Sequence, residues 1–335
     1  MRAPPSDLDD SEIADQLHAS WEIRVERIEY VPIGGGSHHW RATSAGGIHW
    51  VTVDDLDEKG FLGASREAAL AGLRAAIETA VAVGNTGLDF VLLPVPATGG
   101  QRVRTLGGHY ALALFPYIAG RTFAFHQTVP DELRERVLMM LARLHGVPAT
   151  AAPAVRPAPL RPSSFRYLER ALSEIDQGWR AGPLAEPARA VLRRHRDQLG
   201  GLMQEFERLA RRIEAGPAGR VITHGEPHPA NLIADGSSLL LIDWDTVALA
   251  PPERDLWWLA SEPGSFSPYE EITGRAVDPV AIRLYRIRWA LDDAGLFTNQ
   301  LRAPHAGDPN TEHCLRALTV TLETLPQVRG EPLSA

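Results

Sequence analysis

The spacing of apolar residues changes near residue 120, and this change limits the chain to a fold with two differently built parts. Before it, residues 21–56 are rich in β-branched and aromatic residues interrupted by glycine turns, which predicts strands. Further strands are predicted at 101–106 and 109–117. Between these regions, residues 65–83 are alanine-rich with leucines at helical spacing and predict a helix. The first part is therefore expected to be a mainly antiparallel sheet with one helix.

The second part has mainly helical patterns. Residues 130–146 begin with a proline, keep leucine and valine on one face and end at a glycine, which predicts a helix. A proline-rich stretch at 150–164 predicts an irregular loop. Residues 185–215 show apolar steps of three and four and predict a second, long helix. Three short strand-like segments follow, and the chain is again helical from residue 253.

These patterns predict an α+β fold with two lobes. A small β-rich lobe is expected at 1–115, a short connection at 116–120, and a larger, mainly helical lobe at 121–335. The length of 335 residues is about two domains' worth, which agrees with this division.

The amino-acid composition excludes several classes of protein. The single cysteine, Cys314, excludes an internal disulfide framework and any multi-cysteine metal site. A formal net charge of -8 argues against a nucleic-acid partner and favours a cationic small molecule. No apolar run is long enough for a membrane span, and the acidic N-terminus does not resemble a signal peptide, so a soluble cytoplasmic protein is expected.

Polar residues are concentrated on loops between apolar strands within 22 positions. Burying carboxylates is costly unless they bind something. A hairpin between Asn231 and Asp243 would bring an amide oxygen and a carboxylate to one end, where they would suit Mg²⁺ bound to phosphates. The residues of this stretch are His224, Glu226, His228, Asn231, Asp243 and Asp245.

This stretch resembles the kinase-like phosphotransferases, and among them the aminoglycoside phosphotransferase family. Members carry H-G-D-x-H-P-x-N, a hairpin, I-D-W or I-D-F, and a downstream D-L. The matching segments here are HGEPHPAN at 224–231, IDW at 242–244 and DL at 255–256. LARLHG at 141–146 matches the preceding helix, and FPYIAGRT at 115–122 matches the connection between lobes. The IDWD…PPERDL segment is most similar to the spectinomycin-type branch.

The resemblance implies a protein-kinase-like fold and an ATP- or GTP-dependent enzyme that phosphorylates a hydroxyl of an aminoglycoside, an aminocyclitol or a similar natural product. It implies that Asn231 and Asp243 hold Mg²⁺ and that Glu226 accepts the hydroxyl proton, which makes these three the catalytic residues. His224 and Asp255 would brace the loop. Residues implied to contact the nucleotide are Gly34, Gly35, Gly36 and Ser37 at the phosphates, and Phe115 and Tyr117 at the adenine.

Two departures from the family pattern stand out. Glu226 occupies the position of the family's aspartate, with the same chemistry but one more methylene group. The strand that should carry a phosphate-binding lysine near position 52 or 53 has Thr52 and Val53 instead.

One lysine is available to replace the missing one, because Lys59 is the only lysine among 34 basic residues. Arg41, on the neighbouring predicted strand, is the other candidate, although a guanidinium is not equivalent to an ammonium. We select Lys59 as a nucleotide-binding residue. In the family pattern an acidic residue of the first helix orients this cation, and the sequence leaves Glu67 and Glu78 open for that role.

Acidic residues of the helical part are candidates to line a pocket for a cationic substrate. They are Glu253, Glu262, Glu270, Glu271, Asp292 and Asp293.

Three other function classes are alternatives to a phosphotransferase. A metal-dependent deaminase would use His224 and Glu226 but also needs P-C-x-x-C, and Cys314 lies in no such motif. A metal-dependent hydrolase leaves the spacing from Asn231 to Asp243 unexplained. A kinase-like protein that binds and sequesters a small molecule without catalysis remains the alternative, since it would account for Glu226 and the missing strand lysine.

Overall fold

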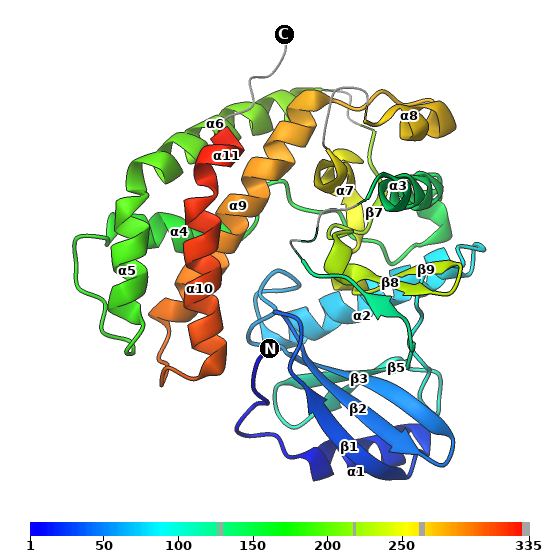
Figure 1. Cartoon of the computed structure of the whole chain (residues 1–335). Helices are drawn as coiled ribbons and strands as arrows, with labels where there is room; N and C mark the ends of the chain where they lie inside the picture. The colour runs from blue at the N-terminus through cyan, green and yellow to red at the C-terminus, as the bar shows by residue number, and fades with distance from the viewer. Residues whose placement is uncertain (126, 128–129, 217–218, 261–264, 330–335) are drawn as a thin grey trace. The chain divides into compact units, whose positions relative to one another are not determined.

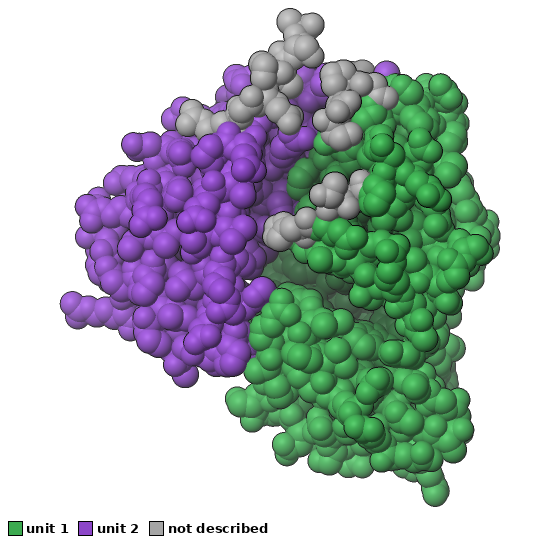
Figure 2. Space-filling model, in the orientation of Figure 1, with its two compact units in different colours: residues 1–158, 220–275 green, residues 159–219, 276–335 purple. Residues whose placement is uncertain are grey.

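The structure, a computed structural model of the 335-residue chain, contains two compact units (Figures 1 and 2). Unit 1 comprises residues 1–158 and 220–275, and unit 2 comprises residues 159–219 and 276–335. The polar segment at 224–256 therefore shares a unit with the N-terminal sheet, while the lobe boundaries at 115 and 120 remain a prediction. The residues described by the structure are 1–125, 127, 130–216, 219–260 and 265–329.

The predicted N-terminal sheet is confirmed as five strands in the order β1-β2-β3-β5-β4, each antiparallel to its neighbours. Figure 1 labels β1, β2, β3 and β5 of this sheet. Alternation along β3 sends Val51 and Val53 into one core, while Thr52 and Asp54 point to the opposite face. The strands are β1 (Val25–Val31), β2 (His38–Ser44), β3 (Gly47–Asp55), β4 (Val103–Leu106) and β5 (Tyr110–Pro116).

The predicted helix at 65–83 is α2 (Arg66–Gly84). Ser65 begins it, because the Ser65 side chain accepts a hydrogen bond from the N–H of Ala68. Leu73 and Ile77, one turn apart, pack against the face of the sheet that carries Ala111.

Residues 10–21 form a helix, α1 (Asp10–Trp21), where the sequence analysis predicts no element and starts a strand at residue 21. Ile13 and Leu17 are fully buried and pack against the face of the sheet opposite to α2. Asp9 and Glu12 form a capping box at its start. Acidic residues therefore stabilise the start of this helix, and the same residues make its apolar pattern hard to see in the sequence.

The remainder of unit 1 consists of short elements around α3 (Asp131–His145), the helix predicted at 130–146. Strands β6, β8 and β9 form one small antiparallel sheet, and β7 pairs with β10. Helix α3 packs against β7, α7 and α8. The elements are η1 (Ala149–Ala151), β6 (Arg121–Thr122), β7 (Val221–Thr223), η2 (Pro229–Asn231), β8 (Leu232–Asp235), β9 (Ser238–Leu241), η3 (Trp244–Thr246), β10 (Ala248–Ala250), α7 (Glu253–Leu256), η4 (Trp257–Leu259) and α8 (Ser267–Thr273).

Unit 2 is helical and is built around α9 (Pro279–Arg302), which packs against each of the other helices of the unit. The single helix predicted at 185–215 is wrong: it is two helices, α5 (Ala185–Arg194) and α6 (Arg196–Ala215), which meet at His195. The apolar spacing continues across this break and so conceals it. The remaining helices are α4 (Ser164–Ser173), α10 (Pro309–Glu323) and α11 (Leu325–Arg329).

No helix in the described ranges combines the length and the hydropathy needed to span a membrane.

Candidate active site

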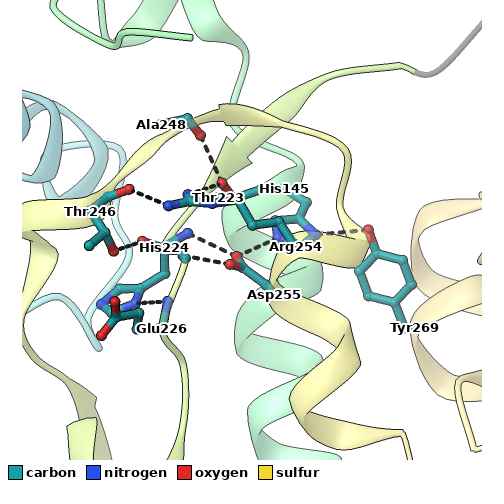
Figure 3. Close-up of polar contacts among 10 residues, drawn as sticks. His145, Thr223, His224, Glu226, Thr246, Ala248, Arg254, Asp255 and Tyr269 are labelled. Atoms are coloured by element: carbon teal, nitrogen blue, oxygen red, sulfur yellow. Dashed lines mark hydrogen bonds and ion pairs between the residues drawn. The ribbon is translucent and has the colours of Figure 1, made fainter. Parts of the chain in front are cut away.

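The loop after β7 is held by one buried carboxylate, that of Asp255 on α7 (Figure 3). The backbone N–H of His224 donates to Asp255 Oδ2 at 2.8 Å, and that of Gly225 donates to Asp255 Oδ1 at 2.6 Å. Hydrogen bonds to an ionised acceptor are among the strong ones, and here they fix the direction in which the loop leaves the strand. These contacts agree with the bracing role that the family resemblance implies for Asp255.

Asp255 is itself positioned from α3 and α8. His145 Nε2 lies 2.9 Å from Asp255 Oδ2, and His145 Nδ1 lies 2.8 Å from the hydroxyl of Tyr269. Burial acts to raise the pKa of Asp255, but the hydrogen bond and charge of His145 outweigh it and hold that pKa below its usual value. Sequence reasoning missed Tyr269, and only the LARLHG segment pointed to His145.

A close packing contact requires glycine at position 225. Gly225 has a φ of +102°, and a β-carbon there would lie 2.4 Å from Arg254 Nη2 and 2.7 Å from Thr246 Oγ1. The Arg254 guanidinium occupies this space because it donates to Thr223 Oγ1 at 2.8 Å and to the Thr246 carbonyl at 2.9 Å. The loop, β7 and η3 are thus held to one another through a buried arginine.

His224 connects the loop to the strand that precedes Asp243. Its Nε2 lies 3.0 Å from the Ile242 carbonyl, and its Nδ1 accepts from the Glu226 N–H at 3.2 Å. Burial lowers the pKa of His224 to about 4, so the ring is neutral at physiological pH and donates through Nε2. His224 therefore braces the loop, as the resemblance implies.

The expected hairpin joins Asn231 to Asp243. Strands β8 and β9 pair in antiparallel register, and the Ile242 N–H donates to the Asn231 carbonyl at 3.0 Å. This bond brings the two ends of the hairpin together, with Asp243 as the next residue along the chain. Asp243 has a φ of 66°, a left-handed conformation that is uncommon outside glycine and clusters at functional sites.

Glu226 lies in the loop with 31% of its side chain exposed. His228 Nε2 is 3.7 Å from Glu226 Oε2, and the rings of Phe125 and Trp258 pack edge-on against His228. Burial acts to raise the pKa of Glu226, but the interaction with His228 and the charges of neighbouring basic groups hold it below its usual value. The side chain is therefore an ionised carboxylate at neutral pH, the form that accepts a proton.

Two further carboxylates crowd the turn after β9. Desolvation by the surrounding protein and the charge of Asp245 raise the pKa of Asp243 above its usual value, although Asp243 keeps an accessible surface. Desolvation also raises the pKa of Asp245. A cation bound here would relieve the repulsion between these carboxylates.

The side-chain oxygens of Asn231 and Asp243, at this end of the hairpin, are suitable ligands for a magnesium ion that is also bound to phosphates. Mg²⁺ typically takes one or two protein oxygen ligands and completes its shell with phosphate oxygens and water. Asp243 offers a carboxylate. Asn231 Nδ2 donates to the Glu226 carbonyl at 2.9 Å, which sets the amide with its oxygen on the other side. Across the described residues, no group of three or more His, Cys, Asp or Glu could hold a metal ion by itself.

Lys59 lies in the turn after β3 with only 3% of its side chain exposed. Its Nζ is 2.8 Å from Asp54 Oδ1 and 2.8 Å from Asp245 Oδ2, and it donates to Ser37 Oγ at 3.1 Å. The lysine that we select from the sequence thus lies beside Ser37, one of the residues implied to contact phosphate. Sequence reasoning missed Asp54 as its partner.

The sequence also offered Arg41 as the phosphate-binding cation and Glu67 or Glu78 as its acidic partner, and none of these three contacts Lys59 through an ion pair in the described structure. Arg41 donates through Nε to Glu29 Oε2 at 3.1 Å, and 41% of its side chain is exposed. Glu67 and Glu78 are exposed on α2, so the expectation that this helix supplies the acidic partner is wrong for Lys59. The acidic partners of Lys59 come from β3 and η3, and Lys59 itself lies after the strand and not on it.

The remaining nucleotide candidates lie on two connections. Gly34, Gly35, Gly36 and Ser37 link β1 to β2, and Gly34 has a φ of +71° that allows the tight turn. Phe115 lies near the end of β5 and Tyr117 follows it, in the connection that leads to Gly120. A β-carbon at Gly120 would lie 2.5 Å from Ile233 Cγ2, so glycine lets this connection run against β8.

The acidic residues proposed to line a substrate pocket differ in burial and in their contacts. Glu253 is buried on α7, and Asp292 on α9 accepts a hydrogen bond from Ser164. Glu271 is exposed on α8. Glu262 lies outside the described residues.

With this geometry in place, comparisons with known proteins identify the family. The model of a family described as the phosphotransferase enzyme family matches residues 32–286. The chain belongs to this phosphotransferase family. The match includes the glycine-rich turn, Lys59, the loop at 224–231 and the end of the hairpin.

Protein StrN of Streptomyces griseus is 28% identical over 326 residues, which span 93% of this chain and 91% of StrN. Spectinomycin phosphotransferase, solved with ADP and spectinomycin, is 16% identical with a TM-score of 0.74 over 96% of this chain and 99% of its own. Amicoumacin kinase, solved with AMP-PNP and Ca²⁺, is 11% identical with a TM-score of 0.56 over 95% and 94% of the two chains. The predicted α+β kinase-like fold is confirmed by these similarities.

Replacement of Asp255 by Asn is expected to lower the free energy of unfolding by about 2–4 kcal/mol, because two backbone N–H groups and His145 would share one neutral oxygen. The loss should depend on pH. Since the folded protein lowers the pKa of Asp255, its stabilisation is fully present above the unfolded-state pKa of about 3.9 and disappears as the pH falls through the lower folded-state value.

Urea unfolding between pH 3 and pH 7 would measure this difference, with Asp235→Asn, an exposed position at the end of β8, as control. Equal stability of the two variants at pH 7 would contradict the bracing role.

Proposed function

We propose that this phosphotransferase transfers the γ-phosphoryl group of ATP or GTP to a hydroxyl of an aminoglycoside or aminocyclitol antibiotic, or of a similar small natural product. The observation that carries the proposal is the pair of hydrogen bonds at Asn231, whose side chain donates to the Glu226 carbonyl at 2.9 Å and whose carbonyl accepts from Ile242, the residue before Asp243, at 3.0 Å. The net charge of -8 supports a cationic acceptor. The relatives that act on spectinomycin and amicoumacin support an antibiotic, and an ATP-dependent enzyme of this kind would work in the cytoplasm.

In the proposed reaction, the acceptor hydroxyl oxygen forms a bond to the γ-phosphorus while the bond from that phosphorus to the β–γ bridging oxygen breaks. The electron pair of the broken bond leaves with the nucleoside diphosphate. The hydroxyl proton passes to the Glu226 carboxylate, whose lowered pKa keeps it ionised and ready to accept. Transfer is direct, without a covalent enzyme intermediate.

The protein's main contribution is positioning and electrostatic stabilisation. Asn231 and Asp243 would hold Mg²⁺, which when bound neutralises charge on the phosphate oxygens. The backbone of Gly34, Gly35 and Gly36 would lie over the phosphates, with Ser37 and Lys59 beside them. The backbone around Phe115 and Tyr117 would receive the adenine or guanine ring.

The first test is product formation with ATP or GTP, Mg²⁺ and a panel of aminoglycosides and aminocyclitols that includes spectinomycin. We expect a phosphorylated product by mass spectrometry with at least one acceptor. Asp243→Asn should abolish it, because the only carboxylate of the metal pair is lost, whereas Asp235→Asn at the exposed end of β8 should retain it. Near-normal turnover by Asp243→Asn would remove the kinase interpretation of the site.

The role of Glu226 is tested by Glu226→Gln, which keeps the shape but cannot accept the proton. We expect kcat to fall by roughly 10²- to 10⁴-fold with a much smaller change in KM, as for loss of a general base. Glu226→Asp, which keeps a carboxylate and matches the family residue, should retain most of the activity. If Glu226→Gln is as active as the native enzyme, Glu226 has a structural role.

A kinase-like protein that sequesters its ligand is the second candidate, and the glutamate at position 226 is the observation that favours it. It predicts nucleotide or antibiotic binding with no product from any acceptor.

A further inference from the structure

The only lysine of the chain, Lys59, is buried beside two carboxylates. An ammonium has three hydrogens to donate. Three oxygens surround Lys59 Nζ, those of Asp54 at 2.8 Å, Asp245 at 2.8 Å and Ser37 at 3.1 Å. Burying a charged ammonium is costly unless it is paired, so the two carboxylates favour this position of the ammonium.

The segment that carries Lys59 is packed tightly against the start of α2. The Leu62 N–H donates to the Lys59 carbonyl at 2.9 Å, which closes a turn. A β-carbon at Gly72 of α2 would lie 2.4 Å from the Leu62 carbonyl oxygen, and one at Gly63 would lie 2.3 Å from the Ala68 backbone. Two glycines thus let the turn and the helix touch, and the lysine projects from a firmly supported segment.

Helix α2 in turn packs against η3, the element that carries Asp245. The ion pair from Lys59 to Asp245 therefore joins residues 186 positions apart in the sequence. It links the segment after β3 to the turn that begins at Asp243. Burial acts to lower the pKa of Lys59, but the charges of Asp245, Asp54 and Asp243 outweigh it and keep the amine protonated.

The ammonium also lies against the glycine-rich turn. A β-carbon at Gly36 would be 3.8 Å from Lys59 Nζ. Of the three acceptors, the Ser37 hydroxyl is the neutral and most distant one, and it donates independently to Asp54 Oδ1 at 2.6 Å. A phosphate oxygen could therefore replace Ser37 at the ammonium while Ser37 stays bound to Asp54 and both carboxylates keep the lysine in place.

We propose that Asp54 and Asp245 are positioning residues that hold Lys59 at the nucleotide phosphates, in place of a strand lysine paired with an acidic residue of α2. Lys59 touches the phosphate, and the two aspartates act through it. The inference rests on the proposed function, because it assumes that a nucleotide binds at the glycine-rich turn.

A double-mutant cycle tests this, with Lys59→Met, Asp245→Asn and the combined variant. Calorimetry would measure the Kd of each for a non-hydrolysable ATP or GTP analogue with Mg²⁺. We expect each single variant to weaken binding by roughly tenfold to a hundredfold, the range for loss of a hydrogen bond to a charged group. The combined variant should bind no more weakly than Lys59→Met, since Asp245 acts only through the lysine. Glu78→Gln, on the exposed face of α2, is the control and should bind as the native chain does.

The combined variant removes the buried ammonium together with one of its two carboxylate partners and leaves Asp54 bound to the Ser37 hydroxyl, and circular dichroism verifies its fold. If Asp245→Asn weakens binding as much in the Lys59→Met background as in the native chain, Asp245 acts on the metal or nucleotide directly and the inference is overturned. It is also overturned if Asp245→Asn lowers the melting temperature while the folded protein keeps native affinity. If the native chain binds neither analogue, the proposed function itself fails.

Discussion

The carboxylate of Asp255 is the constraint on which the rest of the site depends. It accepts the N–H groups of two successive residues and is fixed from behind by His145. This sets the path of the loop, which in turn places His224 against the Ile242 carbonyl and so fixes the residue before Asp243. A continuous series of hydrogen bonds thus connects helix α3 to the groups at the end of the hairpin.

The cation held between Asp54 and Asp245 is a lysine, and the charges around it favour an ammonium there. Asp54, Asp243 and Asp245 surround Lys59, so the described site is more acidic than its single ammonium can neutralise. An ammonium is compact and donates in three directions, which suits acceptors from three different segments. A guanidinium is planar and pairs best with one carboxylate at a time, as Arg41 does with Glu29. The remaining negative charge is what a metal bound to phosphates would neutralise.

Sequence patterns predicted the individual strands of the sheet, α2, α3 and the hairpin because each is set by residues close together in the chain. They missed α1, whose acidic cap obscures its apolar stripe, and they joined α5 and α6, because the apolar spacing continues past His195. Within the site, the motif spacing selected Glu226, Asn231 and Asp243 but could not find the partners of Lys59. Asp245 lies 186 positions away, and only the packing of α2 against η3 brings it close.

The central claim is that the braced hairpin binds a nucleotide through a metal, and thermal unfolding tests it most directly. The melting temperature would be measured with Mg²⁺ alone, with ATP or GTP alone, and with each nucleotide plus Mg²⁺. A ligand at 100 times its Kd stabilises a folded protein by about 2.7 kcal/mol, so the account predicts a clear rise for one nucleotide that depends on Mg²⁺. Unchanged melting under all these conditions, or a rise that is the same without Mg²⁺, would contradict it.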